Sequence, residues 1–169
     1  MLDVRPMATG ERGGIDRLDA RLLRALAESP RAGVMELARQ LEVARGTVQA
    51  RLEKLQQRGV IRGFAPEVDL RTIGYEVLAF VNLEIAQGRL ADVVEHLASI
   101  PEVLEVHSTT GLGDLHARVI ARNNEHLQEV IGAILAVQGI SRTTTQIALT
   151  EQLPLRILPI VDEAARAAT

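Results

Sequence analysis

A basic helical face is the first feature of this sequence that could do chemistry. The stretch VARGTVQARLEKLQQRGVI, residues 43–61, has apolar residues at helical spacing and a glycine near its end. At about 100° per residue, Val48, Leu52 and Leu55 form one stripe that must pack inward. The other side carries small, polar and cationic residues: Arg45, Gly46, Thr47, Gln49, Ala50, Arg51, Lys54 and Arg58.

Two interpretations fit this face. A surface helix with an arginine bias is one, but solvated helices usually mix long residues of both charges. Here Glu53 is the one acidic residue between Val43 and Arg58, and small residues occupy the centre of the face. Small residues allow close approach to a DNA groove, and flanking cations can meet both phosphate walls. We therefore predict base-edge contacts from Arg45, Thr47 and Gln49, and phosphate contacts from Arg51, Lys54 and Arg58.

The turn GLGD is the second candidate, formed by Gly111, Leu112, Gly113 and Asp114. A plain hairpin explains it, because glycines supply positive φ and an aspartate can cap the turn. The same groups could instead bind an amino acid. Exposed amides would hold its carboxylate, and Asp114 would receive its ammonium group. The residues alone leave both interpretations open.

Other reactive constellations are missing from the sequence. The chain has no cysteine, which excludes disulfides and thiolate metal sites. Its histidines lack recognised metal-ligand spacing, although His107 and His116 could face each other across a hairpin. No nucleophile motif, Walker loop or dinucleotide fingerprint occurs. We predict no catalytic residue, no metal site and no cofactor.

Three helices must position the basic face. The first has apolar residues at helical spacing from Ile15 and stops at SPRAG, residues 29–33; the second covers Met35 to Leu41. The brief turn 42–44 separates it from the third, which ends at Gly59 as the residue after a helix C-cap. A short helix, a tight turn and a longer basic helix form a helix-turn-helix, predicted over residues 15–64.

The GLGD turn lies in a different kind of domain. After a linker over 65–74, residues 75–155 are predicted to form a β-α-β-β-α-β unit, the ferredoxin-like antiparallel sheet with both helices on one face. Its strands are expected at 75–86, 103–110, 114–122 and 140–155, and its helices at 90–100 and 123–138. The fold class is α+β, with tails at 1–14 and 156–169.

Composition supports a globular chain of two modules. The chain has 169 residues, of which 47% are hydrophobic and 2% aromatic. Residues 1–64 hold 12 basic and 8 acidic residues, a net +4, whereas the remainder holds 7 and 14, a net −7. This split suggests nucleic acid as a partner of the front module. No apolar run or leader pattern suggests a membrane or export, so we expect a cytoplasmic protein.

The strand VLAFVNLEI, residues 77–85, predicts assembly. It is nearly all apolar, and alternate residues point to opposite faces of a sheet that has helices on one face only. The second apolar set needs a cover, and the same face of a second copy related by a two-fold axis would supply it.

The two modules together resemble a known family. The segment LDARLLRALAESPRAGVMELARQLEVARGTVQARLEKLQQRGVIRGF is similar to the DNA-binding domain of the leucine-responsive/AsnC (Lrp/AsnC, feast-famine) bacterial regulators. The second module, with TTGLGDLHARV, resembles that family's amino-acid-sensing domain, and Gly111 and Asp114 match its ligand loop. The resemblance implies a DNA-binding transcriptional regulator that forms homodimers and larger assemblies and binds an amino-acid effector. The alternative is a metabolic regulatory or adaptor subunit without a DNA role.

The chain departs from that family at two positions. Glu42 lies where the helix-turn-helix turn usually has glycine, and a left-handed backbone there costs of order 1 kcal/mol. Ala44 lies where the recognition helix usually begins with serine, which removes a cap worth roughly 1 kcal/mol.

Overall fold

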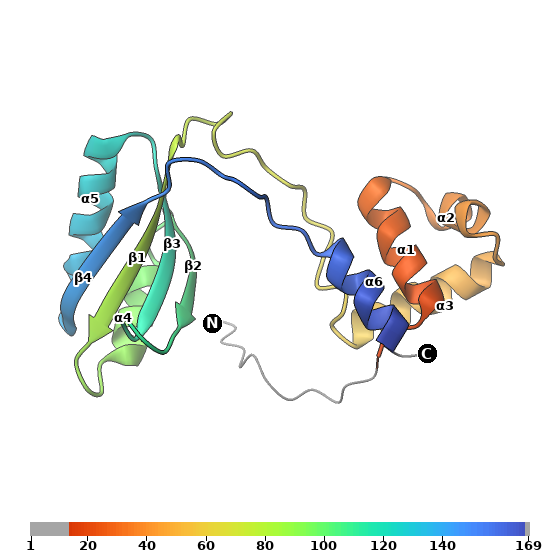
Figure 1. Cartoon of the computed structure of the whole chain (residues 1–169), viewed down its shortest axis with the longest axis horizontal. Helices are drawn as coiled ribbons and strands as arrows, with labels where there is room; N and C mark the ends of the chain where they lie inside the picture. The colour runs from red at the N-terminus through yellow and green to blue at the C-terminus, as the bar shows by residue number, and fades with distance from the viewer. Residues whose placement is uncertain (1–13, 168–169) are drawn as a thin grey trace. The chain divides into compact units, whose positions relative to one another are not determined.

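The described residues form two compact units. The structure is a computed structural model that describes residues 14–167 (Figure 1). One unit contains residues 14–67 and 153–167, and the other contains residues 68–152. The tail expected over 1–14 lies outside the described residues except for Gly14. None of the helices within 14–167 is both long and apolar enough to cross a membrane.

The first unit is helical. Its helices are α1 (Arg17–Glu28), α2 (Val34–Leu41), α3 (Arg45–Gln57) and α6 (Leu158–Ala167). Their inward side chains form one core of Ile15, Ala20, Leu22, Ala25, Leu37, Ala38, Leu41, Val48, Leu55 and Ala165. Val48 and Leu55 are buried and Leu52 packs against them, so the predicted inner stripe of the basic helix is confirmed.

The ends of these helices follow from their sequences. The side chain of Asp16 accepts hydrogen bonds from the amides of Leu18 and Asp19, and the Asp19 side chain accepts one from the Asp16 amide. This reciprocal capping box begins α1. At the end of α3, Gly59 has φ of +68°, and the amide of Val60 donates to the carbonyl of Leu55 at 2.9 Å. Gly59 is therefore the predicted residue after the C-cap.

The C-terminal segment differs from the expectation. The sequence predicts a tail over 156–169, whereas residues 158–167 form α6, which packs against α1. Ala165 is buried in the helical core and Val161 packs against it. The apolar pattern spans only one short helix with Pro159 in its first turn, which gives a weak periodic signal.

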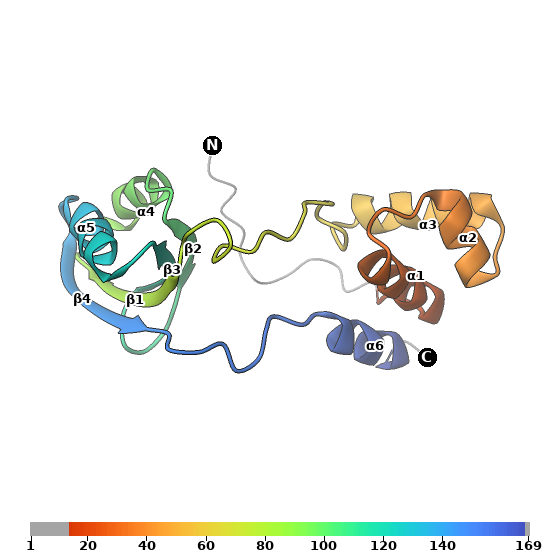
Figure 2. The same cartoon turned by 90° about the horizontal axis from the view of Figure 1, so that it is seen from above.

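The second unit is the expected ferredoxin-like sheet. Its strands are β1 (Val77–Ile85), β2 (Val103–Ser108), β3 (Leu115–Ala121) and β4 (Ile140–Ile147). All neighbours are antiparallel, in the order β2-β3-β1-β4. Helices α4 (Leu90–Ala98) and α5 (Asn124–Leu135) cover one face of the sheet (Figures 1 and 2). The predicted α+β fold with a helix-turn-helix and a ferredoxin-like domain is confirmed.

Alternation along β1 separates the two faces of the sheet. Ala79, Val81 and Leu83 are fully buried against the helices, while the residues between them are partly exposed. The side of β1 that points away from α4 and α5 carries Leu78, Phe80, Asn82 and Glu84.

The N-terminus of α5 is capped as its sequence suggests. The side-chain amide oxygen of Asn123 accepts a hydrogen bond from the backbone amide of His126 at 2.8 Å.

Candidate DNA-binding face and effector pocket

The turn before α3 fixes how this helix begins. Glu42 has φ of 58° and ψ of 43°, and it is the one non-glycine residue with positive φ among those described. Its predicted left-handed backbone is therefore observed. Ala44 occupies the N-cap of α3 and offers no side-chain acceptor to the first amides of the helix. Those amides and the positive end of the helix dipole stay available to an outside anion such as a phosphate.

The start of α3 presents an exposed small-residue face. Arg45, Gly46, Thr47, Gln49 and Ala50 are all exposed. The Gln49 amide nitrogen donates to a carboxylate oxygen of Glu53 at 2.7 Å, one turn further along the helix. This contact orients the side-chain amide of Gln49, whose oxygen takes no part in it. The three residues predicted to contact bases are thus all exposed at the start of α3.

Arg51 has a different environment from the one its sequence position suggests. Its guanidinium donates to the carboxylates of Asp16 and Asp19, with 2.8 Å to Asp19. The Asp19 side chain is 4% exposed and that of Arg51 is 29% exposed. The hydrogen bond from Arg51 lowers the pKa of Asp16, and those two carboxylates raise the pKa of Arg51. The guanidinium is therefore held by two carboxylates at the start of α1, an environment that does not favour the predicted phosphate contact.

The other two residues predicted to contact phosphate, Lys54 and Arg58, are exposed. Arg58 donates to the carbonyl of Gly14 at 3.2 Å, which leaves its charge without a counterion in that contact. Lys54 is exposed in the last turn of α3. Both side chains can reach an anion, and the structure adds Asp16 and Asp19 as residues that position the helix. The spacing of these aspartates at the start of a helix is the sequence signal for a capping box, but it does not reveal the contact with Arg51.

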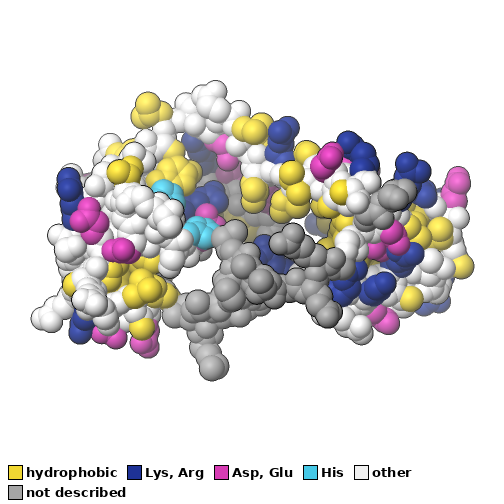
Figure 3. Space-filling view, turned by 60° about the horizontal axis from the view of Figure 1, so that its bottom comes forward, with side chains coloured by type: hydrophobic (Ala, Val, Ile, Leu, Met, Phe, Trp, Pro, Cys, Tyr) yellow, Lys and Arg dark blue, Asp and Glu magenta, His cyan; other side chains and the backbone are white. Residues whose placement is uncertain are grey.

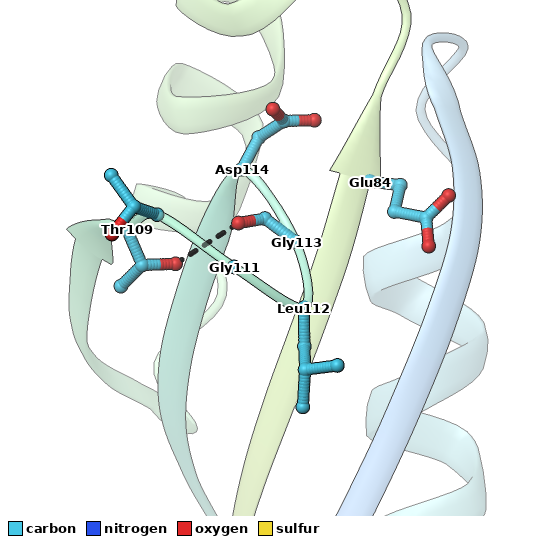
Figure 4. Close-up of a pocket in the computed structure, with 7 residues that line it drawn as sticks. Glu84, Thr109, Gly111, Leu112, Gly113 and Asp114 are labelled. Atoms are coloured by element: carbon cyan, nitrogen blue, oxygen red, sulfur yellow. Dashed lines mark hydrogen bonds between the residues drawn. The ribbon is translucent and has the colours of Figure 1, made fainter.

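A shallow pocket forms at the predicted GLGD turn between β2 and β3 (Figure 4). Its volume is about 450 Å³. It is lined by Glu84, Thr109, Thr110, Gly111, Leu112, Gly113 and Asp114. The sequence identifies four of these residues. It does not identify Glu84, because only the pairing of β1 with β3 brings this residue to the turn.

The turn is fastened to β1 at two points. One oxygen of the Asp114 carboxylate accepts the amide of Ile85 at 2.6 Å, and the Asp114 amide donates to the carbonyl of Leu83 at 2.9 Å. A Cβ atom on Gly113 would lie 2.9 Å from that same carbonyl oxygen, so a larger residue would push the turn off β1. Gly111 has φ of +113°, which favours glycine. The geometry of the turn thus explains why both positions are glycine.

The pocket combines acidic and backbone groups. Two carboxylates line it, and among residues 14–167 the nearest cation to Glu84 is Arg142, at 4.0 Å. The Thr109 hydroxyl donates to the carbonyl of Gly113 at 3.1 Å (Figure 4). Leu112 projects from the turn and is 83% exposed. Carboxylates suit a cationic group of a ligand, and an exposed leucine suits an apolar contact made by a ligand or a neighbouring chain.

Two of the histidines, His107 and His116, lie on the open face of the sheet. His107 and His116 are cross-strand partners, as the predicted hairpin requires. The ring of His116 stacks on Phe80 at 5.5 Å between centroids, and its Nδ1 lies 2.8 Å from the side-chain Oδ1 of Asn82. Within residues 14–167, no group of three or more His, Cys, Asp or Glu side chains is arranged to hold a metal ion.

Two family models match the chain. The AsnC-type helix-turn-helix domain matches residues 15–56, and the Lrp/AsnC ligand binding domain matches residues 78–156. The first covers α1 to α3, and the second covers the sheet, its two helices and the GLGD pocket. Both halves of the predicted resemblance are confirmed by these matches.

Individual relatives agree with the two models. The HTH-type transcriptional regulator FL11 of Pyrococcus horikoshii is 30% identical over 146 residues, which cover 86% of this chain and 97% of the relative. The structure of Escherichia coli AsnC is 33% identical with a TM-score of 0.80, covering 86% of this chain and 99% of that one. A feast or famine regulatory protein from M. tuberculosis, solved with L-methionine, is 26% identical with a TM-score of 0.75, covering 84% and 97%. The chain therefore belongs to the Lrp/AsnC family of transcriptional regulators, which are not enzymes.

Proposed function

We propose that α3 recognises operator DNA and that an amino acid bound at the GLGD pocket controls this recognition. Regulation of transcription is the function of the family, which argues against the adaptor role considered as the alternative. A regulator of this kind acts on the chromosome, so the proposed location is the cytoplasm.

The exposed start of α3 carries the DNA proposal. Gly46 and Ala50 let the helix backbone approach a groove, and Arg45, Thr47 and Gln49 flank them on the open surface. Arginine and glutamine can each make bidentate contacts with base edges, to guanine and adenine respectively. The open N-terminus of α3, Lys54 and Arg58 would meet phosphates, which orient the protein without reading sequence.

The effector proposal rests on the acidic pocket. Glu84 and Asp114 would surround the ammonium group of an amino acid, and amides of the turn would bind its carboxylate. One carboxylate oxygen of Asp114 already accepts from Ile85, so Glu84 and the other oxygen of Asp114 are the groups available to a ligand. The solved relative with L-methionine supports an amino acid as the ligand class.

A homodimer is the proposed assembly. The face of the sheet away from α4 and α5 carries Leu78 and Phe80 beside Asn82 and His116. A second copy packed on this face about a two-fold axis would cover the apolar residues. It would also present two α3 helices to half-sites separated by whole turns of DNA.

A gel shift with DNA upstream of the protein's own gene, with and without each common amino acid, tests the proposal. We expect a complex that survives competition by unrelated DNA and that responds to one amino acid or a few. Equal affinity for operator and unrelated DNA would reject the role of α3. If no amino acid changes DNA binding, the proposed role of the pocket is rejected.

A further inference from the structure

A cavity between α1 and α6 carries positive charge that the proposed operator contacts do not use. Its volume is about 390 Å³. It is lined by Arg17, Ala20, Arg21 and Arg24 of α1 and by Asp162, Ala165 and Arg166 of α6. Four arginines and one carboxylate thus line this α1–α6 groove, together with two small alanines. In Figure 3, dark blue Lys and Arg side chains lie at the surface among magenta Asp and Glu side chains.

Acidic partners neutralise only part of this charge. Arg24 pairs with Asp162 and lies 3.8 Å from Glu28, and Arg166 pairs with Glu163 at 2.9 Å. Arg21 instead donates to a neutral group, the carbonyl of Leu41, at 3.0 Å. Within the described part of the chain, neither Arg17 nor Arg21 has a carboxylate within 4.0 Å. Two of the four arginines that line the groove are therefore without a nearby carboxylate.

The positions of these arginines are unfavourable for α1 alone. Arg17, Arg21 and Arg24 follow one another at spacings of four and three residues, which places like charges side by side on the helix. Arg17 is also the first residue of α1, where the helix dipole disfavours a cation. An anion in the groove would offset both repulsive effects, because it attracts the arginines and the N-terminal end of the helix dipole.

We propose that the α1–α6 groove binds phosphate groups. The planar guanidinium presents paired N–H donors that match phosphate oxygens, and two or more such groups converge on the groove. Seen from above, α1 lies between α6 and α3, so α3 and the α1–α6 groove lie on different sides of α1 (Figure 2). A duplex held by α3 is therefore not the phosphate source. The source is either a free phosphate compound or the backbone of a second DNA segment.

The test uses the full chain and a pair of variants with equal charge change. Arg17→Gln/Arg21→Gln removes the two unneutralised charges. Arg31→Gln/Arg156→Gln removes two exposed arginines of the same unit that do not line the groove. Calorimetry with inorganic pyrophosphate measures the free-phosphate arm, and the salt dependence of binding to long non-operator DNA measures the second arm.

Each arm has a distinct expected result. A free-phosphate site predicts pyrophosphate binding by wild type and control that weakens at least tenfold in the groove variant. A DNA-backbone site predicts that log Kd against log salt loses a slope of roughly two in the groove variant relative to the control, with operator selectivity unchanged. The proposal is overturned if the groove variant matches the control in both arms.

A single substitution on α6 adds a test in the opposite direction. Asp162→Asn removes the one carboxylate that lines the groove and releases Arg24. It should weaken the packing of α6 but strengthen phosphate binding in the arm that responds, by about tenfold. A purely structural role for these residues predicts no gain in binding, so an unchanged or weaker affinity would contradict the proposal even if the double variant misfolds.

Discussion

Arg51 of α3 donates a hydrogen bond of 2.8 Å to the buried carboxylate of Asp19, and this contact fixes the recognition helix against the first turn of α1. Asp19 is the one charged residue buried among those described, and it also caps its own helix. A buried carboxylate that loses its cation is costly, whereas a surface arginine is usually dispensable. The mutational consequences of Arg51 therefore differ from those of its exposed neighbours on α3.

We expect Arg51→Ala to destabilise the helical unit by about 2 kcal/mol, because it leaves the Asp19 carboxylate buried without a cation. Urea unfolding would measure this change. Lys54→Ala serves as the control, since Lys54 is exposed and should unfold like wild type. DNA binding should show the opposite pattern. The slope of log Kd against log salt should fall by about one in Lys54→Ala and stay unchanged in folded Arg51→Ala. A lost slope in Arg51→Ala would restore it as a phosphate contact.

The second contact of Arg51, with Asp16, predicts an acid dependence of stability. The hydrogen bond from Arg51 lowers the pKa of Asp16 in the folded state below its value in the unfolded chain. Its stabilising contribution is therefore fully present above the unfolded pKa of about 4 and is lost as the pH falls through the folded pKa. Wild type should lose stability more steeply than Arg51→Ala below about pH 4. Parallel stability curves for the two proteins in that range would show that the contact does not contribute.

Gln49→Ala should reduce discrimination between operator and unrelated DNA by about 1–3 kcal/mol, the value of a good base contact. Its affinity for unrelated DNA should stay close to that of wild type. Competition gel shifts measure the ratio directly. Gln56→Ala is the matched control, because Gln56 is an exposed glutamine at the far end of the same helix. Equal loss of discrimination in both variants would mean that the base contacts lie elsewhere.

Glu42→Gly should stabilise the helical unit by about 1 kcal/mol, because glycine adopts the left-handed backbone at this turn without a Cβ penalty. Thermal or urea unfolding would detect the gain. Glu42→Ala keeps the Cβ atom and should give none of it. A gain in both variants would point to removal of the negative charge as the cause.

At the pocket, Glu84→Gln should remove stabilisation by the responding amino acid in a thermal shift assay while leaving the unliganded protein as stable as wild type. Asp114→Asn should remove the same response, but its loss of the charged acceptor for the Ile85 amide should also lower the unliganded melting temperature. Asp114→Ala should lower it further. A full amino-acid response in Glu84→Gln and Asp114→Asn would return GLGD to the status of a plain turn.

Light scattering tests the proposed dimer. The purified protein should have at least twice the mass of one chain at micromolar concentration, and Phe80→Glu should reduce it by placing a charge on the open face of the sheet. Glu95→Gln, on the exposed side of α4, should not. A stable wild-type monomer would reject the dimer and the symmetric operator that depends on it.

Local patterns predict most of this fold, and long-range contacts account for the rest. The stripe of Val48, Leu52 and Leu55 follows from helical periodicity, and the order of β1 to β4 follows from alternation and a glycine turn. The role of Arg51 does not, since its carboxylate partners lie 35 and 32 residues earlier in the chain.

The candidate pocket divides in the same way. A turn signal identifies Gly111 to Asp114, because four consecutive residues carry it. Glu84 joins them only through the pairing of β1 with β3, and no local feature of its strand distinguishes it from other exposed strand residues. Likewise, α6 is short, and its burial depends on a partner helix more than a hundred residues earlier.

The position of α6 also bears on how the protein folds during synthesis. Residues 158–167 leave the ribosome after the entire sheet, yet Ala165 belongs to the core formed by α1, α2 and α3. Part of the apolar surface of the nascent helix-turn-helix therefore stays uncovered while the sheet is being translated. At a typical elongation rate of about 5–20 residues per second, this interval lasts several seconds. The sheet can complete its own core first, so the DNA-binding unit, although it begins earlier in the chain, is the last to be finished.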